Sequence, residues 1–85
     1  SISIIYSLIL RLRGIFLIKK LIEKKNYSKK GFSVWMRKDL DVNEFKKVYN
    51  IYKSIRDNKK VKEKIKIETA EKLLETLKKE VRKLK

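Results

Sequence analysis

The opening segment of this chain is apolar around most of a helical circumference, and this constrains the fold more than any other feature. Its large apolar residues recur every three or four positions, at Ile4, Ile5, Leu8, Ile9, Leu12, Ile15, Phe16, Leu17, Ile18, Leu21 and Ile22. That spacing predicts an α-helix from about Ser3 to Lys25. A helix that is apolar nearly all round belongs at the centre of a bundle or in an interface between subunits.

A membrane-spanning role for this segment is disfavoured by its length and charge. The apolar stretch is short for a span, and Arg11 and Arg13 lie inside it. Each arginine would cost about 2.5 to 3.5 kcal/mol at the centre of a bilayer. A signal peptide does not fit either, because the charges follow the apolar start. We therefore expect no membrane span and a cytoplasmic protein.

Composition limits the chemistry that these residues can perform. The 85 residues contain no His, no Cys and no Pro, and only two glycines. Without His and Cys there is no imidazole base, thiol nucleophile or usual zinc site. Two isolated glycines do not form a phosphate-binding loop. We find no catalytic residues and no metal site of the chain's own. The Lys, Glu and Ile bias resembles hyperthermophile usage, although AT-rich coding gives the same bias.

A short second helix is predicted after a break at residues 25–28. Ser28 is a candidate N-cap, and the helix should end near Lys38. Three large residues at helical spacing would form its buried face, namely Phe32, Trp35 and Met36. Gly31 weakens this helix or lets another part of the chain approach closely.

A third helix is predicted by the spacing of Asp41 and Glu44, which is that of a capping box. With Asp39 these carboxylates could share a cation, but capping explains them better. The helix should end at Asp57–Asn58, because Asn tolerates the left-handed conformation. Its apolar stripe consists of Phe45, Val48, Tyr49, Tyr52 and Ile55.

A last helix is expected from about Glu68 to Leu84, after a lysine-rich loop at residues 59–66. Its apolar residues are Ala70, Leu73, Leu74, Leu77, Val81 and Leu84. The fold class is therefore all-α, a compact up-and-down bundle of about four helices, two long and two shorter. We expect a single helical domain over residues 1–85. Because the sequence opens on an apolar segment without Met, we expect a fragment or the C-terminal part of a larger protein.

The net charge of +15 predicts an anionic partner. Such a charge attracts nucleic acid, nucleotides, acidic membranes or an acidic protein over long range. A lysine-rich surface that only keeps the protein soluble is the alternative. Lys greatly outnumbers Arg, and Arg is the better residue for bidentate phosphate recognition.

The candidate anion site consists of Tyr49, Tyr52 and Arg56, which share one face of the third predicted helix. A guanidinium beside two phenols can hold a phosphate or stack on a base. The alternative is two half-buried tyrosines with Arg56 paired to Asp57. Arg11 and Arg13 are further candidates, because arginines in an apolar helix need an anion, carboxylates or a neighbouring domain.

The order of these features resembles the helical domain that follows the catalytic domain in some prokaryotic, archaeal-type nucleotidyltransferases. The similar segments are residues 6–17 (YSLILRLRGIFL), 26–32 (NYSKKGF) with Trp35, 49–58 (YNIYKSIRDN) and 67–74 (IETAEKLL). The resemblance implies a bundle related to the substrate-binding domains of kanamycin-nucleotidyltransferase-like proteins and to HEPN domains. It covers nearly the whole chain.

The resemblance also implies separate roles for a catalytic domain and a helical domain. In such proteins a polymerase-β-like domain carries a Gly-Ser motif and metal-binding aspartates, and would hold the nucleotide with magnesium. The helical domain contributes substrate binding or dimerisation, and Tyr52 and Arg56 would lie nearest the substrate. HEPN ribonucleases have a His shortly after an Arg, whereas Lys59 and Lys60 follow Arg56 here. RNase activity is therefore not expected.

Two other functions stay open. The first is a basic helical nucleic-acid-binding module, favoured by the charge and by the aromatic residues Trp35, Tyr49 and Tyr52. The second is a structural module whose apolar first helix forms a dimer interface. The expected partners are thus a nucleotidyltransferase catalytic domain, a second copy in a homo-oligomer, and nucleic acid or another anionic ligand.

Overall fold

The structure is a computed structural model that describes residues 2–84, and it confirms an all-α fold of four helices. The helices are α1 (Ile2–Ile22), α2 (Lys29–Met36), α3 (Val42–Arg56) and α4 (Ile67–Lys83). Within residues 2–84 there is no strand, and residues 59–66 form the predicted loop. Ser1 and Lys85, which the sequence analysis included, lie outside the described residues.

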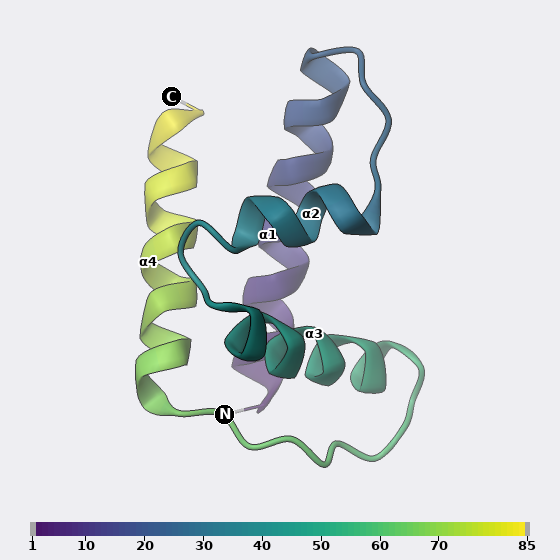
Figure 1. The fold of residues 1–85 in the computed structure, drawn as a ribbon, viewed down its shortest axis with the longest axis vertical. Helices are drawn as coiled ribbons and strands as arrows, with labels where there is room; N and C mark the ends of the chain where they lie inside the picture. Colours follow the sequence, from purple (N-terminus) through teal and green to yellow (C-terminus); the bar gives the residue numbers. More distant parts are fainter. Residues whose placement is uncertain (1, 85) are drawn as a thin grey trace.

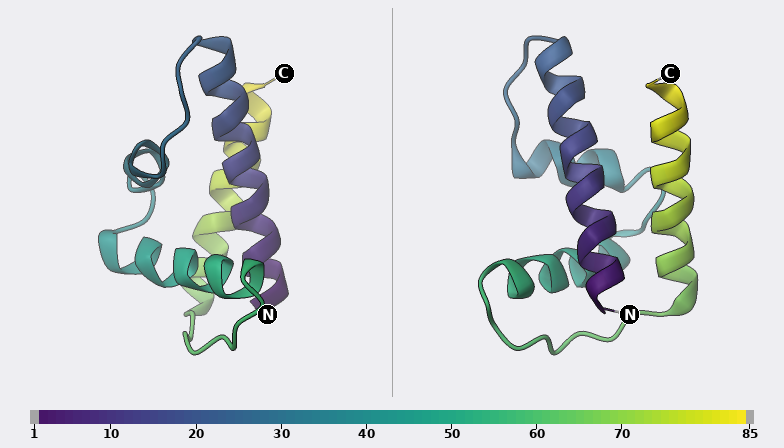
Figure 2. Two further views of the ribbon diagram at one scale, coloured as in Figure 1. Left: turned by 90° about the vertical axis from the view of Figure 1, so that its right-hand side faces the viewer. Right: turned by 180° about the vertical axis from the view of Figure 1, so that it is seen from behind.

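The two long helices, α1 and α4, lie side by side, and the shorter helices α2 and α3 cross the same face of this pair (Figures 1 and 2). The bundle is compact, with extents of 36 × 24 × 20 Å. The direction in which the helices run could not be predicted from the spacing of apolar residues. The long helices run in the same direction, because the two crossing helices and the loop after α3 return the chain to the end where it began (Figure 1).

The core is built around one face of α1. Its buried residues are Ile5, Leu8, Ile9, Leu12, Ile15 and Phe16. The ring of Phe16 lies 5.6 Å from that of Phe32 and 5.3 Å from that of Trp35, centroid to centroid. Burying one such side chain contributes about 1.5–3 kcal/mol. The opposite face of α1 stays exposed, so within the described chain α1 is a core helix on one face only.

Helix capping fixes where α2 and α3 begin, as predicted. The Ser28 hydroxyl accepts a hydrogen bond from the Gly31 N–H at 2.9 Å. The Asp41 carboxylate accepts from the Glu44 N–H at 2.7 Å, and the Glu44 carboxylate accepts from the Asp41 N–H at 3.1 Å. Asn58 has a φ of 57°, which confirms a left-handed residue after α3.

Gly31 allows this cap to form against the core. A Cβ atom at this position would lie 2.9 Å from the Ser28 hydroxyl oxygen and 3.4 Å from the Phe16 ring. The first distance is too short for real Cβ contacts, so a larger residue would displace the cap. Close approach, rather than a turn, explains glycine here.

The predicted apolar face of α4 is wrong at three positions. Leu73 and Leu77 are buried, but three further residues of the stripe are exposed, namely Leu74, Val81 and Leu84. Polar side chains take the buried positions instead, at Thr69, Thr76 and Glu80. Each has a polar partner on another element, which removes most of the usual cost of burying a polar group.

Glu80 joins α4 to two other parts of the chain. Its carboxylate is fully buried, and Lys38 donates to Oε2 at 2.7 Å and Lys83 at 3.2 Å. The Nζ atom of Lys19 on α1 lies 3.7 Å from Oε1, too far for a hydrogen bond. Burial alone would raise the pKa of Glu80, but the hydrogen bonds from Lys38 and Lys83 outweigh it and lower that pKa.

Two further ion pairs hold α4 against the segment from α2 to α3. Lys79 donates to Asp39 at 3.0 Å and Lys72 donates to Glu44 at 3.0 Å. The hydrogen bond from the Asp41 N–H, opposed by some burial and helped by Lys72, lowers the pKa of Glu44. Asp39 and Glu44 therefore both face α4.

Replacing Glu80 by Gln tests this anchor. We expect Glu80→Gln to lower the free energy of unfolding by about 2 kcal/mol at pH 7, because the hydrogen bonds become neutral. A carboxyl whose pKa is lowered by folding gives stability that is complete above its unfolded pKa, near 4.5, and lost as pH falls through the folded pKa. Urea denaturation at pH 7 and pH 3 should show that the variant lacks this part of the acid sensitivity. If the control variant Glu75→Gln, at an exposed position, lost as much stability and acid sensitivity, the role of Glu80 as an anchor would be contradicted.

The capping box gives a second prediction. Asp41→Ala should cost about 1 kcal/mol of stability, since the first turn of α3 loses its acceptor. The matched control is Asp57→Ala at the other end of α3, where the pair with Arg56 is exposed and should matter little. Thermal denaturation followed by circular dichroism measures both. A smaller loss for Asp41→Ala than for Asp57→Ala would show that the box does not stabilise α3.

Candidate anion-binding groove

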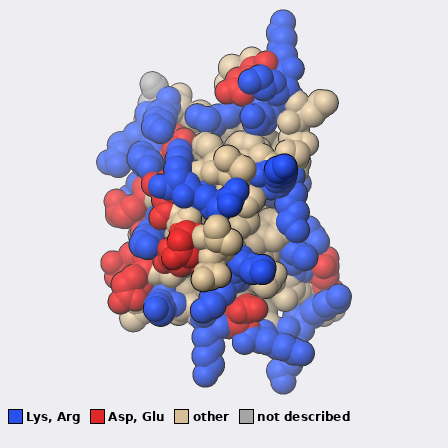
Figure 3. Space-filling model, in the orientation of Figure 1, with Lys and Arg blue, Asp and Glu red and all other residues tan. Residues whose placement is uncertain are grey.

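Six of the ten acidic side chains lie on α4 or pair with its lysines. Figure 3 shows the acidic atoms gathered mainly over the α4 side, while basic atoms dominate the side of α2 and α3. Many cations of α2, α3 and the following loop have no carboxylate within ion-pair distance in residues 2–84. They include Lys29, Lys30, Arg37, Lys46, Lys47, Lys53, Lys59, Lys60 and Lys62.

A hollow between α2 and α3, which we call the basic groove, has a volume of about 370 Å³. Four cations line it, namely Lys29, Arg37, Lys46 and Lys53, and no carboxylate is among its lining residues. Neighbouring cations without a counter-ion repel one another, and a bound anion relieves that repulsion. The groove therefore has the charge of a phosphate or carboxylate site.

Aromatic rings form the floor of the basic groove. Phe45 and Tyr49 stack with ring centroids 5.5 Å apart, and the ammonium of Lys29 lies 4.9 Å from the centroid of the Tyr49 ring. Burial raises the pKa of the Tyr49 phenol, so it stays protonated at neutral pH. Ser33 and Asn50 add neutral polar groups at the walls.

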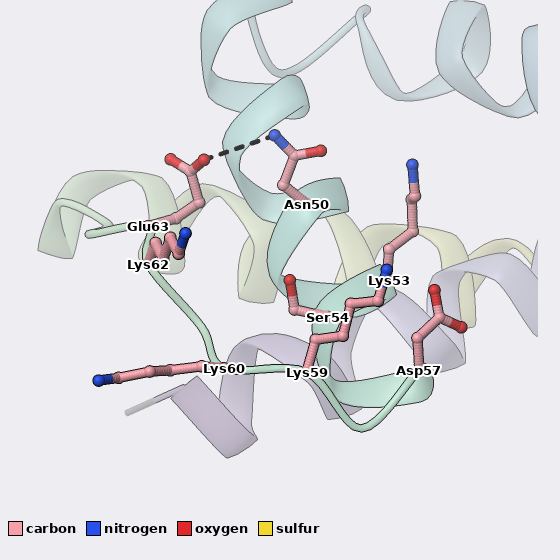
Figure 4. Close-up of a pocket in the computed structure, with 8 residues that line it drawn as sticks. All are labelled: Asn50, Lys53, Ser54, Asp57, Lys59, Lys60, Lys62 and Glu63. Carbon is pink, nitrogen blue, oxygen red and sulfur yellow. Dashed lines mark hydrogen bonds between the residues drawn. The ribbon is translucent and has the colours of Figure 1, made fainter.

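A second hollow of about 450 Å³ lies between the end of α3 and the loop after it. It shares Asn50 and Lys53 with the basic groove, so the two hollows are adjacent. Figure 4 shows Asn50 donating to Glu63 across one wall, at 3.5 Å, while Lys60 points away from the other side chains. Lys59 and Lys62 add cations, but two carboxylates also line this hollow. Its lining is therefore less purely cationic than that of the basic groove.

The predicted cluster of Tyr49, Tyr52 and Arg56 is assembled, but its tyrosines belong to the core. The rings of Tyr49 and Tyr52 lie 5.7 Å apart, and the guanidinium of Arg56 lies 5.6 Å from the Tyr52 ring centroid. Tyr52 is only 4% exposed and stacks on Tyr6. Arg56 donates to Asp57 at 3.0 Å, and this hydrogen bond lowers the pKa of Asp57. This arrangement is the alternative considered from the sequence.

Arg11 and Arg13 do not join that cluster. The guanidinium of Arg13 lies over the Tyr27 ring, 4.9 Å from its centroid, which gives it an aromatic partner inside the domain. Arg11 is exposed on the other side of α1 and has no ion pair in residues 2–84. Neither arginine lines the basic groove.

Sequence reasoning missed all four cations of the groove, although α3 carried a signal for two of them. Lys46, Tyr49 and Lys53 stand at i, i+3 and i+7 on one helix face. This spacing places one lysine on each side of the tyrosine. Lys29 and Arg37 had no such signal. They reach the groove only because α2 crosses beside α3, which is a tertiary arrangement.

Neither a metal site nor a membrane span is found in the described part of the chain. Residues 2–84 contain no group of three or more His, Cys, Asp or Glu side chains placed to hold a metal ion. The helices of the same residues are too short or too charged to cross a membrane.

Comparison with known proteins gives no match for this chain. No protein-family model, no curated protein and no solved structure corresponds to it. Functional proposals for the chain therefore rest on the chemistry of the basic groove and on the sequence resemblance.

Proposed function

We propose that this chain is an accessory, non-catalytic helical domain that holds a phosphate-bearing substrate for a nucleotidyltransferase catalytic domain outside these residues. The observation that carries the proposal is the basic groove, which four cationic residues line and no carboxylate lines. Its volume of about 370 Å³ falls in the usual range for small-ligand sites. Ammonium and guanidinium groups form strong, charge-assisted hydrogen bonds to phosphate oxygens.

The link to a nucleotidyltransferase is supported by the sequence resemblance, which includes residues 49–58 of α3. The same helix supplies Lys46 and Lys53 to the basic groove. Arg56, one turn further along, is half exposed and its contact with Asp57 is a surface pair that an anionic substrate can replace. A gene with no Gly-Ser and Asp-x-Asp domain encoded before Ser1 or next to it would contradict this link.

Removing two groove cations tests substrate binding directly. Lys46→Ala/Lys53→Ala should weaken binding of a labelled nucleoside triphosphate by about tenfold or more, because each lost phosphate contact costs on the order of 1 kcal/mol. Fluorescence anisotropy measures the dissociation constant.

The matched control is Lys25→Ala/Arg82→Ala, which removes the same charge from exposed cations that have no ion pair in residues 2–84 and do not line the groove. Its dissociation constant should change less than threefold. Equal weakening by both double variants would show that the net charge binds the nucleotide, not the groove.

A second candidate function is nucleic-acid binding, and the adjacency of the two hollows favours it. Together they extend the cationic surface from Arg37 on the α2 side to Lys62 in the loop after α3. A single nucleotide fills only part of that length, whereas a single strand can follow it with successive phosphates.

Ligand length separates the two candidates. If nucleic acid is the ligand, a 12-nucleotide single-stranded RNA should bind far more tightly than a nucleoside triphosphate. Its log affinity should fall with log salt at a slope of about −3, as expected for four phosphate contacts to a single strand. Lys60→Ala/Lys62→Ala should weaken RNA binding alone. Similar affinity for both ligands would favour the accessory substrate-binding domain.

A further inference from the structure

The face of the molecule opposite the basic groove is apolar and has no partner in residues 2–84. It is formed by the outer sides of α1 and α4, which lie in front when the molecule is seen from behind (Figure 2, right). Most of the exposed large apolar residues belong to these two helices. They include Ile4, Leu10, Ile18, Leu21, Ile67, Leu74 and Val81. Exposed apolar faces of this extent mark interaction surfaces.

The α4 part of this face has the pattern of a coiled coil. Apolar residues alternate at spacings of three and four through five intervals, at Ile67, Ala70, Leu74, Leu77, Val81 and Leu84. Leu77 also packs in the core of the chain, but Ile67 is 74% exposed and Leu74 41%. The intramolecular core therefore uses one edge of this stripe and leaves the other free. A second helix packs on such a seam by inserting its own side chains between these residues.

We infer that a second copy of this chain covers the face, with the α4 helices of the two copies antiparallel about a two-fold axis near Leu74. In that arrangement Leu74 meets Leu74 of the second copy, and Ile67 meets Val81. Glu71 comes opposite Lys78 of the second copy, and Lys78 comes opposite its Glu71. The same opposite-charge pair thus forms twice, which is the self-complementarity that a two-fold interface requires.

The fold itself selects the antiparallel direction. In a parallel pair, residues such as Glu71 and Lys78 would face the other edge of the seam of the second copy, where Leu73 and Glu80 stand. Both of those residues are buried in their own chain. In the antiparallel pair, the exposed edge of one α4 faces the exposed edge of the other. The contact of Lys78 with Glu75 in its own chain is 3.6 Å long and exposed, so it leaves Lys78 available.

Area and charge fit a second copy better than an unrelated basic or acidic partner. The face spans the two longer dimensions of the molecule, 36 and 24 Å, which is enough for the roughly 800 Å² per partner of a standard interface. Of the 25 cations, 13 lie in residues 29–66, which form α2, α3 and the segments that follow them. Pairing through α1 and α4 therefore keeps the two basic grooves apart, on the outer sides of the dimer.

A charge swap on exposed residues tests the arrangement. The full chain should sediment as a dimer at 50 µM in 150 mM salt. Glu71→Lys and Lys78→Glu should each raise the dimer dissociation constant by about tenfold, because two-fold symmetry changes both pairs at once. The double variant Glu71→Lys/Lys78→Glu should restore the original value. Because both residues are exposed, none of these variants should alter the circular dichroism spectrum.

An apolar substitution provides an independent readout. Leu74→Asp should give a monomer, whereas Val34→Asp, at an exposed apolar residue of α2 outside the face, should stay dimeric. A monomeric parent chain would overturn the inference and leave the face to another partner. A double charge variant that fails to regain the dimer would overturn the antiparallel arrangement. Dissociation by Val34→Asp equal to that by Leu74→Asp would place the interface elsewhere.

Discussion

The buried contact of Glu80 with three lysines is the interaction on which the rest of this structure depends. Lys19 comes from α1, Lys38 follows α2, and Lys83 belongs to α4, so one carboxylate fixes the last helix against both the first and the crossing pair. Two further ion pairs, Asp39 with Lys79 and Glu44 with Lys72, hold α4 at other points along its length. A carboxylate in such a position is costly to bury alone. The hydrogen bonds of Lys38 and Lys83 to Oε2 and the charge of Lys19 near Oε1 offset that cost.

The carboxylates that pair at α4 are not available to neutralise the cations on α2 and α3. The chain has ten acidic and 25 basic residues, and six of the acids lie on α4 or pair with its lysines. The cations on the far side of α2 and α3 are left without counter-ions, and the crossing of these two helices gathers them around an aromatic floor. The molecule then has two different faces: a cationic one over α2 and α3, and an apolar one over α1 and α4. One architecture thus separates the surface proposed to bind anions from the surface proposed to bind a second copy.

Local features of the fold could be predicted from the sequence, whereas the groove could not. Ser28, Asp41 and Asn58 mark helix ends through short-range chemistry, and the structure confirms each of them. The buried face of α4 was assigned wrongly, because tertiary partners let Thr76 and Glu80 enter the interior in place of Leu74 and Val81. The cations of the groove come from two helices whose crossing depends on packing. Helical periodicity within one segment carries no information about that crossing.

Mapping ligand contacts residue by residue tests the central claim most directly. With the ¹⁵N-labelled chain, addition of inorganic triphosphate at low salt should shift the backbone amide signals at the groove, around Lys29, Arg37, Lys46 and Lys53. The signals of the outer face of α4, around Leu74 and Val81, should not move. Shifts spread evenly over all lysine-rich segments, or concentrated on α4, would contradict the claim that turning the carboxylates toward α4 leaves a specific anion site between α2 and α3.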